Sequence, residues 1–291
     1  MPGSIRYIDI HAHLNLAAFN DDREEVLVRT REAGVARINV GTKESTSRRA
    51  VEIAESHEDV YAIVGLHPIQ TTPQEHDEDE IGEGGAPFAS KGEVFDKDLY
   101  RGLCASRKVV AIGECGLDYY RNDPNTRDVQ EEQFIAQIAL ANELSLPLMI
   151  HTRDAKGNSA SASASGRTVY DDVYDILKQY AKVPGDIHFY AGTYAQAKKF
   201  FDLGFSVSFT GVITFAKDYE EVVRNAPLDM IHAETDCPFV SPVPFRGTRN
   251  EPMHVREVYR KIAEIKGMDE EEVRVQLMHN ASRLFATIMY A

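Results

Sequence analysis

The chain has 291 residues, of which 43% are hydrophobic, and a formal net charge of −14. This length suits one large domain or two small ones, and the hydrophobic content is ample for a sizeable core. No apolar run reaches the roughly 18 residues that a membrane-spanning helix needs, so we expect no membrane partner. The N-terminal residues lack the basic and apolar regions of a secretory signal. The negative charge opposes non-specific binding of polyanions, so a nucleic-acid ligand requires a local basic or metal-bearing cleft.

Strand-like and helix-like segments alternate along almost the whole chain. The predicted strands are residues 5–8, 36–40, 60–66, 109–113, 148–150, 186–189, 205–210 and 230–234. The predicted helices are residues 24–33, 44–56, 95–106, 125–145, 170–180, 195–203, 251–266 and 269–286. Such alternation predicts βα units and a parallel sheet. Eight strands in one chain predict an α/β fold, a (β/α)8 TIM-type barrel with extra C-terminal helices. No segment has the character of a linker, so we expect residues 1–291 to form a single domain.

Two segments interrupt this pattern. Residues 71–94 are acidic and contain several glycines, which predicts a solvated insertion in a βα loop. A calcium loop is the weaker alternative, because the ligand spacing of an EF-hand is absent. Residues 157–166 are almost entirely serine, alanine and glycine, which predicts a long, mobile loop at the mouth of the barrel.

Only three cysteines occur, Cys104, Cys115 and Cys237. They form no C-x-x-C pair, and their odd number argues against a disulfide framework. A reducing compartment follows as the expectation, and we take it to be the cytoplasm.

His11 and His13 follow the first predicted strand. Residues i and i+2 of a strand face the same side, so the two imidazoles are expected to point the same way and could form half of a metal site. The alternative is one buried structural histidine beside one exposed histidine. Further metal-type side chains at the ends of later strands favour the first interpretation.

Four such side chains lie at or just after the ends of later predicted strands: Glu114, His151, His188 and Asp236. Barrels of this type carry their active sites at the C-terminal ends of the strands. We predict two divalent metal ions, one held by His11, His13, Glu114 and Asp236 and the other by Glu114, His151 and His188, with Glu114 as the bridge. Two ions roughly 3.5–4 Å apart can activate a water and hold both oxygens of a phosphoryl displacement.

Three other residues are candidate substrate contacts. Arg153 lies two residues beyond His151, and its guanidinium could hold a phosphate; a surface ion pair with Asp154 or Glu131 is the alternative. His67 ends the third strand and either contacts substrate or caps the barrel core. Tyr119 could stack on a base, although core packing explains it equally well.

Several stretches occur in the order that is typical of one known family. They are Asp9-Ile10-His11-Ala12-His13, Gly65-Leu66-His67-Pro68, Gly113-Glu114-Cys115-Gly116-Leu117-Asp118-Tyr119-Tyr120, His151-Thr152-Arg153-Asp154-Ala155, His188-Phe189-Tyr190-Ala191-Gly192, Thr210-Gly211-Val212-Ile213-Thr214-Phe215, Glu234-Thr235-Asp236-Cys237-Pro238, Arg249-Asn250-Glu251-Pro252 and Asn280-Ala281-Ser282-Arg283-Leu284-Phe285. Through them the chain resembles the TatD-type metal-dependent deoxyribonucleases, which are amidohydrolase-like barrels. The ligand positions that this resemblance implies coincide with those predicted above. The family often has His-Pro-His after strand 3, whereas this chain has His67-Pro68-Ile69, so we expect its substrate affinity or preference to differ.

These observations lead to a functional hypothesis. The chain is expected to be a metal-dependent phosphodiester hydrolase, an exonuclease acting on single-stranded DNA or 3′ ends, in which Asp236 takes a proton from the attacking water. Histidine-rich ligation favours zinc or manganese, whereas the resemblance implies magnesium. One alternative is ester hydrolysis, because some TatD-like barrels are implicated in removing D-amino acids from tRNA. Another is a non-enzymatic metal-binding protein that interacts with a partner.

Overall fold

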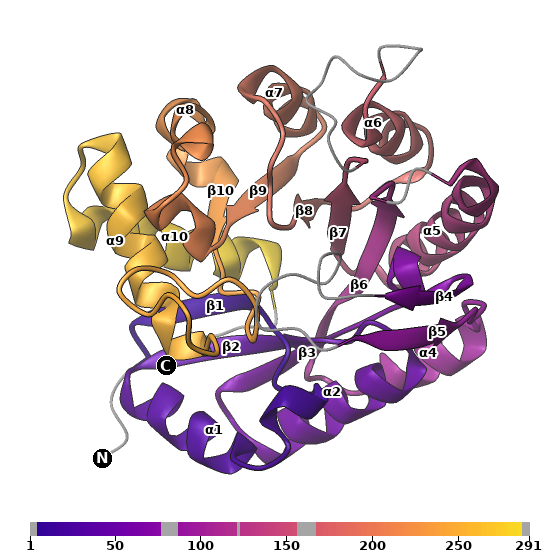
Figure 1. Ribbon diagram of the computed structural model, residues 1–291, viewed down its shortest axis with the longest axis horizontal. Coiled ribbons are helices and arrows are strands. Elements are labelled where there is room, and N and C mark those ends of the chain that lie inside the picture. The colour runs from indigo at the N-terminus through magenta and orange to yellow at the C-terminus, as the bar shows by residue number, and fades with distance from the viewer. Residues whose placement is uncertain (1–4, 77–86, 121–122, 156–166, 287–291) are drawn as a thin grey trace.

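The computed structural model describes residues 5–76, 87–120, 123–155 and 167–286. Its main sheet has eight strands in the order β1-β2-β3-β6-β7-β8-β9-β10, and all neighbouring pairs are parallel (Figure 1). These strands are β1 Tyr7–Ala12, β2 Val35–Val40, β3 Val60–Val64, β6 Val109–Asp118, β7 Leu148–Arg153, β8 Gly185–Ile187, β9 Phe205–Phe209 and β10 Ile231–Ala233.

The two edge strands of the sheet meet beyond the end of β10. Ala12 and Cys237 form an isolated parallel bridge, in which the Asp236 amide donates to the His11 carbonyl at 2.9 Å and the His13 amide donates to the Cys237 carbonyl at 2.9 Å. The barrel is therefore nearly closed, and the predicted (β/α)8 fold is confirmed.

Helices lie between the strands and around the sheet (Figure 1). They are α1 Arg23–Glu32, α2 Glu44–Ser56, α4 Lys97–Leu103, α5 Pro124–Leu144, α6 Val169–Tyr180, α7 Tyr194–Asp202, α8 Glu220–Asn225, α9 Val255–Lys266 and α10 Glu270–Leu284. Sequence signals set several of these boundaries. Thr168, for example, begins α6 with a capping box, in which its hydroxyl accepts from the Asp171 amide while the Asp171 side chain accepts from the Thr168 amide. Among the helices that the structure describes, none is long and apolar enough to cross a membrane.

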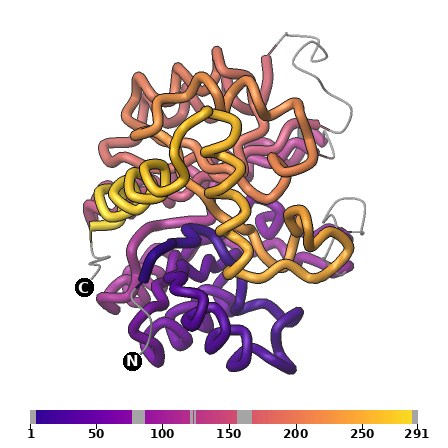
Figure 2. The backbone as a smooth tube through the Cα atoms, turned by 90° about the vertical axis from the view of Figure 1, so that its left-hand side faces the viewer, coloured from indigo at the N-terminus to yellow at the C-terminus, as the bar shows by residue number. Residues whose placement is uncertain are grey.

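The predicted C-terminal helices close one end of the barrel. Met278, Ala281 and Phe285 pack with residues near the start of several strands, including Ile8 of β1 and Val110 of β6. Figure 2 shows the C-terminal segment lying against the N-terminal strand, and α10 contacts both β1 and β10. Helix α10 therefore covers the N-terminal ends of these strands, opposite the ends at which the candidate ligands lie.

The acidic insertion differs from its prediction. Its base forms an antiparallel hairpin of β4 Pro73–His76 and β5 Phe88–Lys91, whereas we expected only solvated loop. His76 is buried and stacks on Phe88, with ring centroids 4.7 Å apart, and the Ser90 hydroxyl donates to the Thr72 carbonyl at 2.6 Å. Because the segment is rich in charged residues, its sequence shows no strand pattern at the positions that pair. Residues 77–86, and the serine- and alanine-rich loop predicted at 157–166, lie outside the described residues.

Strands β6 and β7 both extend beyond their predicted ends, and this extension forms the floor of the site. Their pairing shifts register between Ile112 and Cys115 and then continues to Asp118 and Arg153. Two glycines make this approach possible, because both Gly113 and Gly116 have positive φ. A Cβ at Gly113 would overlap the Met149 carbonyl, and one at Gly116 would overlap the His151 carbonyl.

Candidate active site

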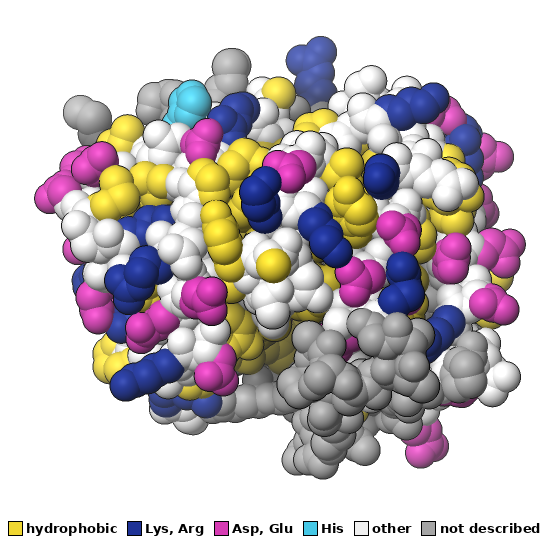
Figure 3. Space-filling model, turned by 90° about the horizontal axis from the view of Figure 1, so that it is seen from above, with side chains coloured by type: hydrophobic (Ala, Val, Ile, Leu, Met, Phe, Trp, Pro, Cys, Tyr) yellow, Lys and Arg dark blue, Asp and Glu magenta, His cyan; other side chains and the backbone are white. Residues whose placement is uncertain are grey.

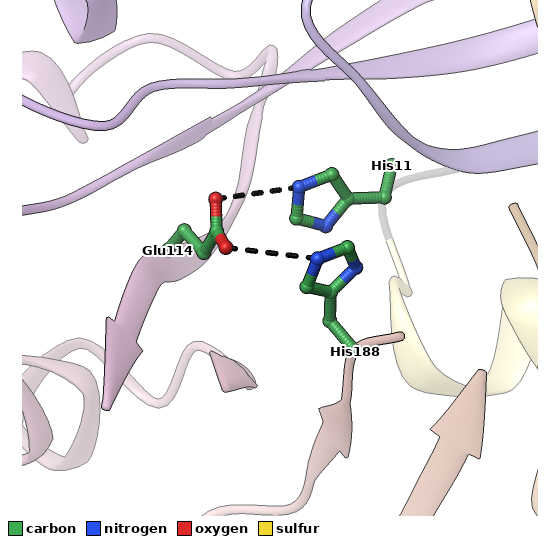
Figure 4. A group of neighbouring side chains, drawn as sticks. All are labelled: His11, Glu114 and His188. Atoms are coloured by element: carbon green, nitrogen blue, oxygen red, sulfur yellow. Dashed lines mark ion pairs between the residues drawn. The ribbon is translucent and has the colours of Figure 1, made fainter. Parts of the chain in front are cut away.

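The imidazoles of His11 and His188 lie beside the carboxylate of Glu114 at the C-terminal ends of the strands, and all three residues are buried (Figure 4). His11 Nε2 lies 3.5 Å from Glu114 Oε2, and His188 Nε2 lies 3.6 Å from Glu114 Oε1. His11 and His188 stack on each other, with ring centroids 3.6 Å apart. The two oxygens of one carboxylate therefore face histidines from β1 and from the end of β8.

The first predicted ligand group is brought together on the Oε2 side. His11 and His13 point their Nε2 atoms at each other across 3.1 Å, and Asp236 Oδ1 lies 3.2 Å from His13 Nε2 and 3.8 Å from His11 Nε2. His13 Nε2 is 3.8 Å from Glu114 Oε2. Ligand-type atoms of His11, His13 and Asp236 all lie within 4.8 Å of one another, which is close enough to share one ion.

The second predicted group, together with one further residue, lies on the Oε1 side. His151 Nδ1 is 3.0 Å and His188 Nε2 is 3.6 Å from Glu114 Oε1, as the predicted group requires. His67, which we predicted as a substrate contact, also reaches this oxygen, with its Nε2 at 3.3 Å. Atoms of His67, Glu114 and His151 form a second set within 4.8 Å.

The hydrogen bonds of His67 indicate which of its two ring nitrogens carries the proton. Its Nδ1 accepts from the amide of Ile69 at 3.1 Å, so in the neutral ring the proton lies on Nε2. That N–H is directed at Glu114 Oε1 and can donate to an anionic oxygen. His67 is therefore arranged as a donor beside the cluster. The amide that sets this arrangement belongs to Ile69, the residue at the position where the family often has a second histidine.

The sequence model described as TatD related DNase matches residues 8–286. The chain belongs to this family. The uncharacterized metal-dependent hydrolase YabD of Bacillus subtilis is 39% identical over 284 residues, which cover 95% of this chain and 98% of YabD. The 3′-5′ ssDNA/RNA exonuclease TatD of Pantoea ananatis is 32% identical over 291 residues, with 96% and 99% coverage.

A solved structure agrees with this assignment. The crystal structure of YjjV, a TatD homologue from Escherichia coli K12, is 26% identical and superposes with a TM-score of 0.77 over 97% of this chain and 98% of YjjV. The resemblance inferred from the motifs is thus confirmed, and the chain is a metal-dependent hydrolase of the TatD family.

Outer partners orient the imidazoles of this TatD-family site. His13 Nδ1 donates to the Val40 carbonyl at 2.9 Å, which leaves Nε2 as the unprotonated atom that faces the cluster. His188 Nδ1 lies 3.0 Å from Glu234 Oε1, and His151 Nε2 lies 2.9 Å from Asp118 Oδ2. Carboxylates and carbonyls behind ligating histidines fix ring orientation and raise ligand basicity.

Glu234 and Asp118 were not among the predicted site residues, although the sequence around each of them points to the site. Each is a carboxylate that ends or follows a strand, and each lies within a family motif, two or four residues from a predicted ligand. Their role depends on which imidazole they face, and that depends on the register of the barrel. A position at the end of a strand therefore does not show whether a carboxylate binds the metal itself or hydrogen-bonds a histidine that does.

The electrostatics of the site fit a bound cation. Burial raises the pKa of Glu114, but the neighbouring His67 and His11 outweigh it and hold this pKa well below its usual range. Burial lowers the pKa of His188, but Glu234, followed by Asp236 and Glu114, raises it to about 10. Glu114 thus stays ionised and helps to hold a proton on His188, whereas burial, followed by the charge of a neighbouring imidazole, lowers the pKa of His11 and of His67. A divalent ion would replace the proton of His188, and this donor set of imidazoles and carboxylates suits first-row divalent ions.

The predicted substrate residues differ in accessibility. Arg153 ends β7, and its guanidinium lies over the Tyr120 ring, 4.1 Å from the ring centroid. Tyr119 is only 9% exposed; its hydroxyl donates to Asp172 at 3.1 Å and Arg127 covers its ring at 4.2 Å. Stacking of a base on Tyr119 stays a prediction.

The surface charge is mixed on the face seen in Figure 3. Lys and Arg side chains alternate there with Asp and Glu, and the described residues of this face form no continuous basic stripe. With a net charge of −14, this hydrolase gains little from the release of counterions along a duplex.

Proposed function

We propose that this TatD-family hydrolase is a two-metal phosphodiesterase that degrades single-stranded nucleic acid, DNA in particular, from its 3′ end. The observation that carries the proposal is that the two carboxylate oxygens of Glu114 face different pairs of histidines. Its Oε2 faces His11 and His13, while its Oε1 faces His151 and His188. One carboxylate set between two histidine pairs is the arrangement expected of a bridging ligand. Magnesium, manganese and zinc are the candidate ions.

Ions held by these two groups would act as Lewis acids and lower the pKa of an attacking water. The chain itself supplies the proton acceptor. Burial raises the pKa of Asp236, but the hydrogen bond from His13 and the charges of His188 and His11 lower it below its usual range, so the carboxylate is ionised. Asp236 lies at the edge of the cluster and takes the proton of the water. The Nε2–H of His67, which lies 3.3 Å from Glu114 Oε1, would donate to a phosphate oxygen instead once substrate binds.

The substrate class is supported by similarity and by charge. The TatD protein of Pantoea ananatis, which shares the full length of the barrel, is an exonuclease on single-stranded DNA and RNA. A strand end needs few phosphate contacts, which suits a protein with a net charge of −14. Arg153, at the C-terminal end of β7, is the residue that we expect to hold a further phosphate. Location in the cytoplasm, predicted from the cysteine content, remains part of this proposal.

An end-labelled oligonucleotide assay tests this function. Metal-free protein is supplied with magnesium, manganese or zinc and incubated with single-stranded DNA labelled at either end, with D-aminoacyl-tRNA in parallel. We expect stepwise shortening from the 3′ end that requires metal and is lost in Glu114→Gln. Release of the amino acid without cleavage of DNA or RNA would replace the proposal by the esterase alternative. Absence of both reactions and of bound metal would support the non-enzymatic alternative.

A further inference from the structure

An exposed aromatic ring with a guanidinium beside it lies at the barrel mouth, away from the metal cluster. Phe215 follows the short helix Gly211–Thr214 after β9 and is 43% exposed. The guanidinium of Arg246, from the segment after β10, lies 4.0 Å from the centroid of its ring. Val243, on the same segment as Arg246, is 46% exposed. An apolar surface with a cation on it has thus been left open to solvent.

The two segments that carry these residues are packed firmly together. Gly211 is in such close contact with the second segment that a Cβ there would lie 2.8 Å from the Pro242 nitrogen and from the Val240 carbonyl oxygen. The Val243 amide donates to the Thr214 hydroxyl at 2.9 Å. Phe215 and Val243 are therefore held side by side rather than placed on independent loops.

The same segment is also tied to the metal cluster. It begins at Asp236, and the ring of Phe239 lies 6.1 Å from that of His13. Asn250 closes it, donating to the Thr235 carbonyl at 3.0 Å and to the Phe239 carbonyl at 2.8 Å. Because this closed loop carries both Asp236 and Arg246, the exposed ring has a fixed position relative to the candidate ligands.

The chemistry of this surface is that of a platform for a nucleotide. Bases of any sequence stack on exposed aromatic rings, and arginine contributes both a cation for the phosphate and a planar surface. The Arg246 side chain is held in place by its hydrogen bond to the Ser241 carbonyl at 2.9 Å, so it is oriented before a ligand arrives. A second pair of the same type, Arg153 over Tyr120, lies on the other side of the mouth, at the ends of β6 and β7.

We infer that Phe215, Val243 and Arg246 form a subsite for one unpaired nucleotide of a single strand whose end lies at the metal cluster. The base stacks on the open part of the Phe215 ring and against Val243, and Arg246 faces a phosphate. This inference rests on the proposed function and makes it specific: the substrate is held by a base remote from the scissile bond, so it must be single-stranded there.

The test compares Phe215→Ala and Phe215→Trp with the parent and with Tyr180→Ala. Tyr180 is a matched control, because it is aromatic and 37% exposed. It ends α6 shortly before the start of β8 and therefore lies at the opposite end of the barrel from Phe215. Steady-state kinetics use a single-stranded oligonucleotide and a series in which one position at a time is abasic. Thermal unfolding and sedimentation are measured on the same preparations.

Phe215→Ala should lower kcat/KM about 5- to 150-fold, mainly through KM, as expected for the loss of one stacked base. Phe215→Trp should stay near the parent, and Tyr180→Ala should be unchanged. One abasic position should reproduce the loss in the parent and cause no further loss in Phe215→Ala.

Parental kinetics in a folded Phe215→Ala protein, or abasic effects that add to it at every position, would overturn the subsite while leaving the nuclease function intact. A change in oligomeric state without a change in KM would reassign the surface to contact between copies of the chain. If the parent protein cleaves no nucleic acid, the proposed function and the subsite both fail.

Discussion

The side chain of Gln137 is predicted to be the main support of the strand end that carries His67. Gln137 is only 1% exposed on α5, and its amide bonds both main-chain groups of Leu66: Oε1 accepts from the Leu66 amide at 2.8 Å, and Nε2 donates to the Leu66 carbonyl at 2.9 Å. Gly65 makes room for it, because a Cβ there would lie 2.7 Å from Gln137 Oε1. Beyond the end of β3, the Gln137 side chain thus makes the two main-chain hydrogen bonds that a neighbouring strand would otherwise make.

The cost of removing this amide follows from the groups that it leaves behind. In Gln137→Leu the volume is nearly kept, but a buried N–H and a buried C=O of Leu66 both lose their partner. Each unsatisfied buried group costs about 1–3 kcal/mol, which gives about 2–6 kcal/mol for the pair. For a chain of this size we expect the melting temperature to fall by at least about 4 °C.

Gln137→Glu separates the two hydrogen bonds. The carboxylate keeps the acceptor for the Leu66 amide but places an oxygen against the Leu66 carbonyl, which needs a donor. Protonation restores that donor, so the folded state should raise the pKa of the new carboxyl group. Stability relative to the parent should therefore be greatest at low pH and be lost as the pH rises through that raised value.

Urea denaturation of parent, Gln137→Leu and Gln137→Glu between pH 5 and 8 measures both effects, with the exposed Gln179→Leu as control. Kinetics at neutral pH should also show a loss in Gln137→Leu, because His67 follows Leu66 directly. A free-energy change below about 1 kcal/mol for Gln137→Leu, or a pH-independent difference for Gln137→Glu, would refute the reasoning.

Three further predictions concern single contacts. Glu114→Gln should lose more than about tenfold in hydrolysis and lose metal from both groups, as measured by metal analysis; activity within tenfold of the parent would contradict the bridging assignment. Arg153→Lys should lower kcat/KM about 10- to 150-fold at unchanged metal content, because lysine cannot make the two-pronged phosphate contact; unchanged kinetics would remove Arg153 from the site. Arg249, followed by Arg29, lowers the pKa of Asp22 to about 2, so this carboxylate contributes stability above pH 4 that is lost as the pH falls towards 2. The stability difference between the parent and Arg249→Met, followed by urea denaturation, should shrink below pH 4; a constant difference would show that the charge of Asp22 is not involved.

Much of the candidate cluster could be predicted because parallel strands end at one face of a barrel. His11, His13 and His188 needed only strand periodicity and the eight-strand pattern to be brought together. The sequence could not show that His67 would donate to Glu114, since this depends on the amide of Ile69 and on where β3 lies beside β6.

Other features depended on pairing between distant segments. The β4–β5 hairpin joins residues on either side of ten that the structure does not describe, and its partners are short, charged stretches without a clear alternation. Asp118 was expected beyond a strand that ended at residue 113, whereas β6 continues through it to pair with Arg153. Local propensity ended the strand early, because the glycines that usually end strands are here the residues that let two strands approach.

This close approach also explains why one carboxylate can face both histidine groups. The register shift between Ile112 and Cys115 occurs at Glu114, so its side chain leaves the regular alternation of β6 and is directed into the barrel between β1 and β7. Behind it, β6 is pressed against β7 at Gly113 and Gly116, where no side chain could fit. A larger residue at either glycine would move Glu114 relative to His151, whose main chain lies opposite Gly116. The two sides of the cluster are therefore coupled through the backbone of a single strand. The packing of β6 against β7 sets their spacing whether or not an ion is bound.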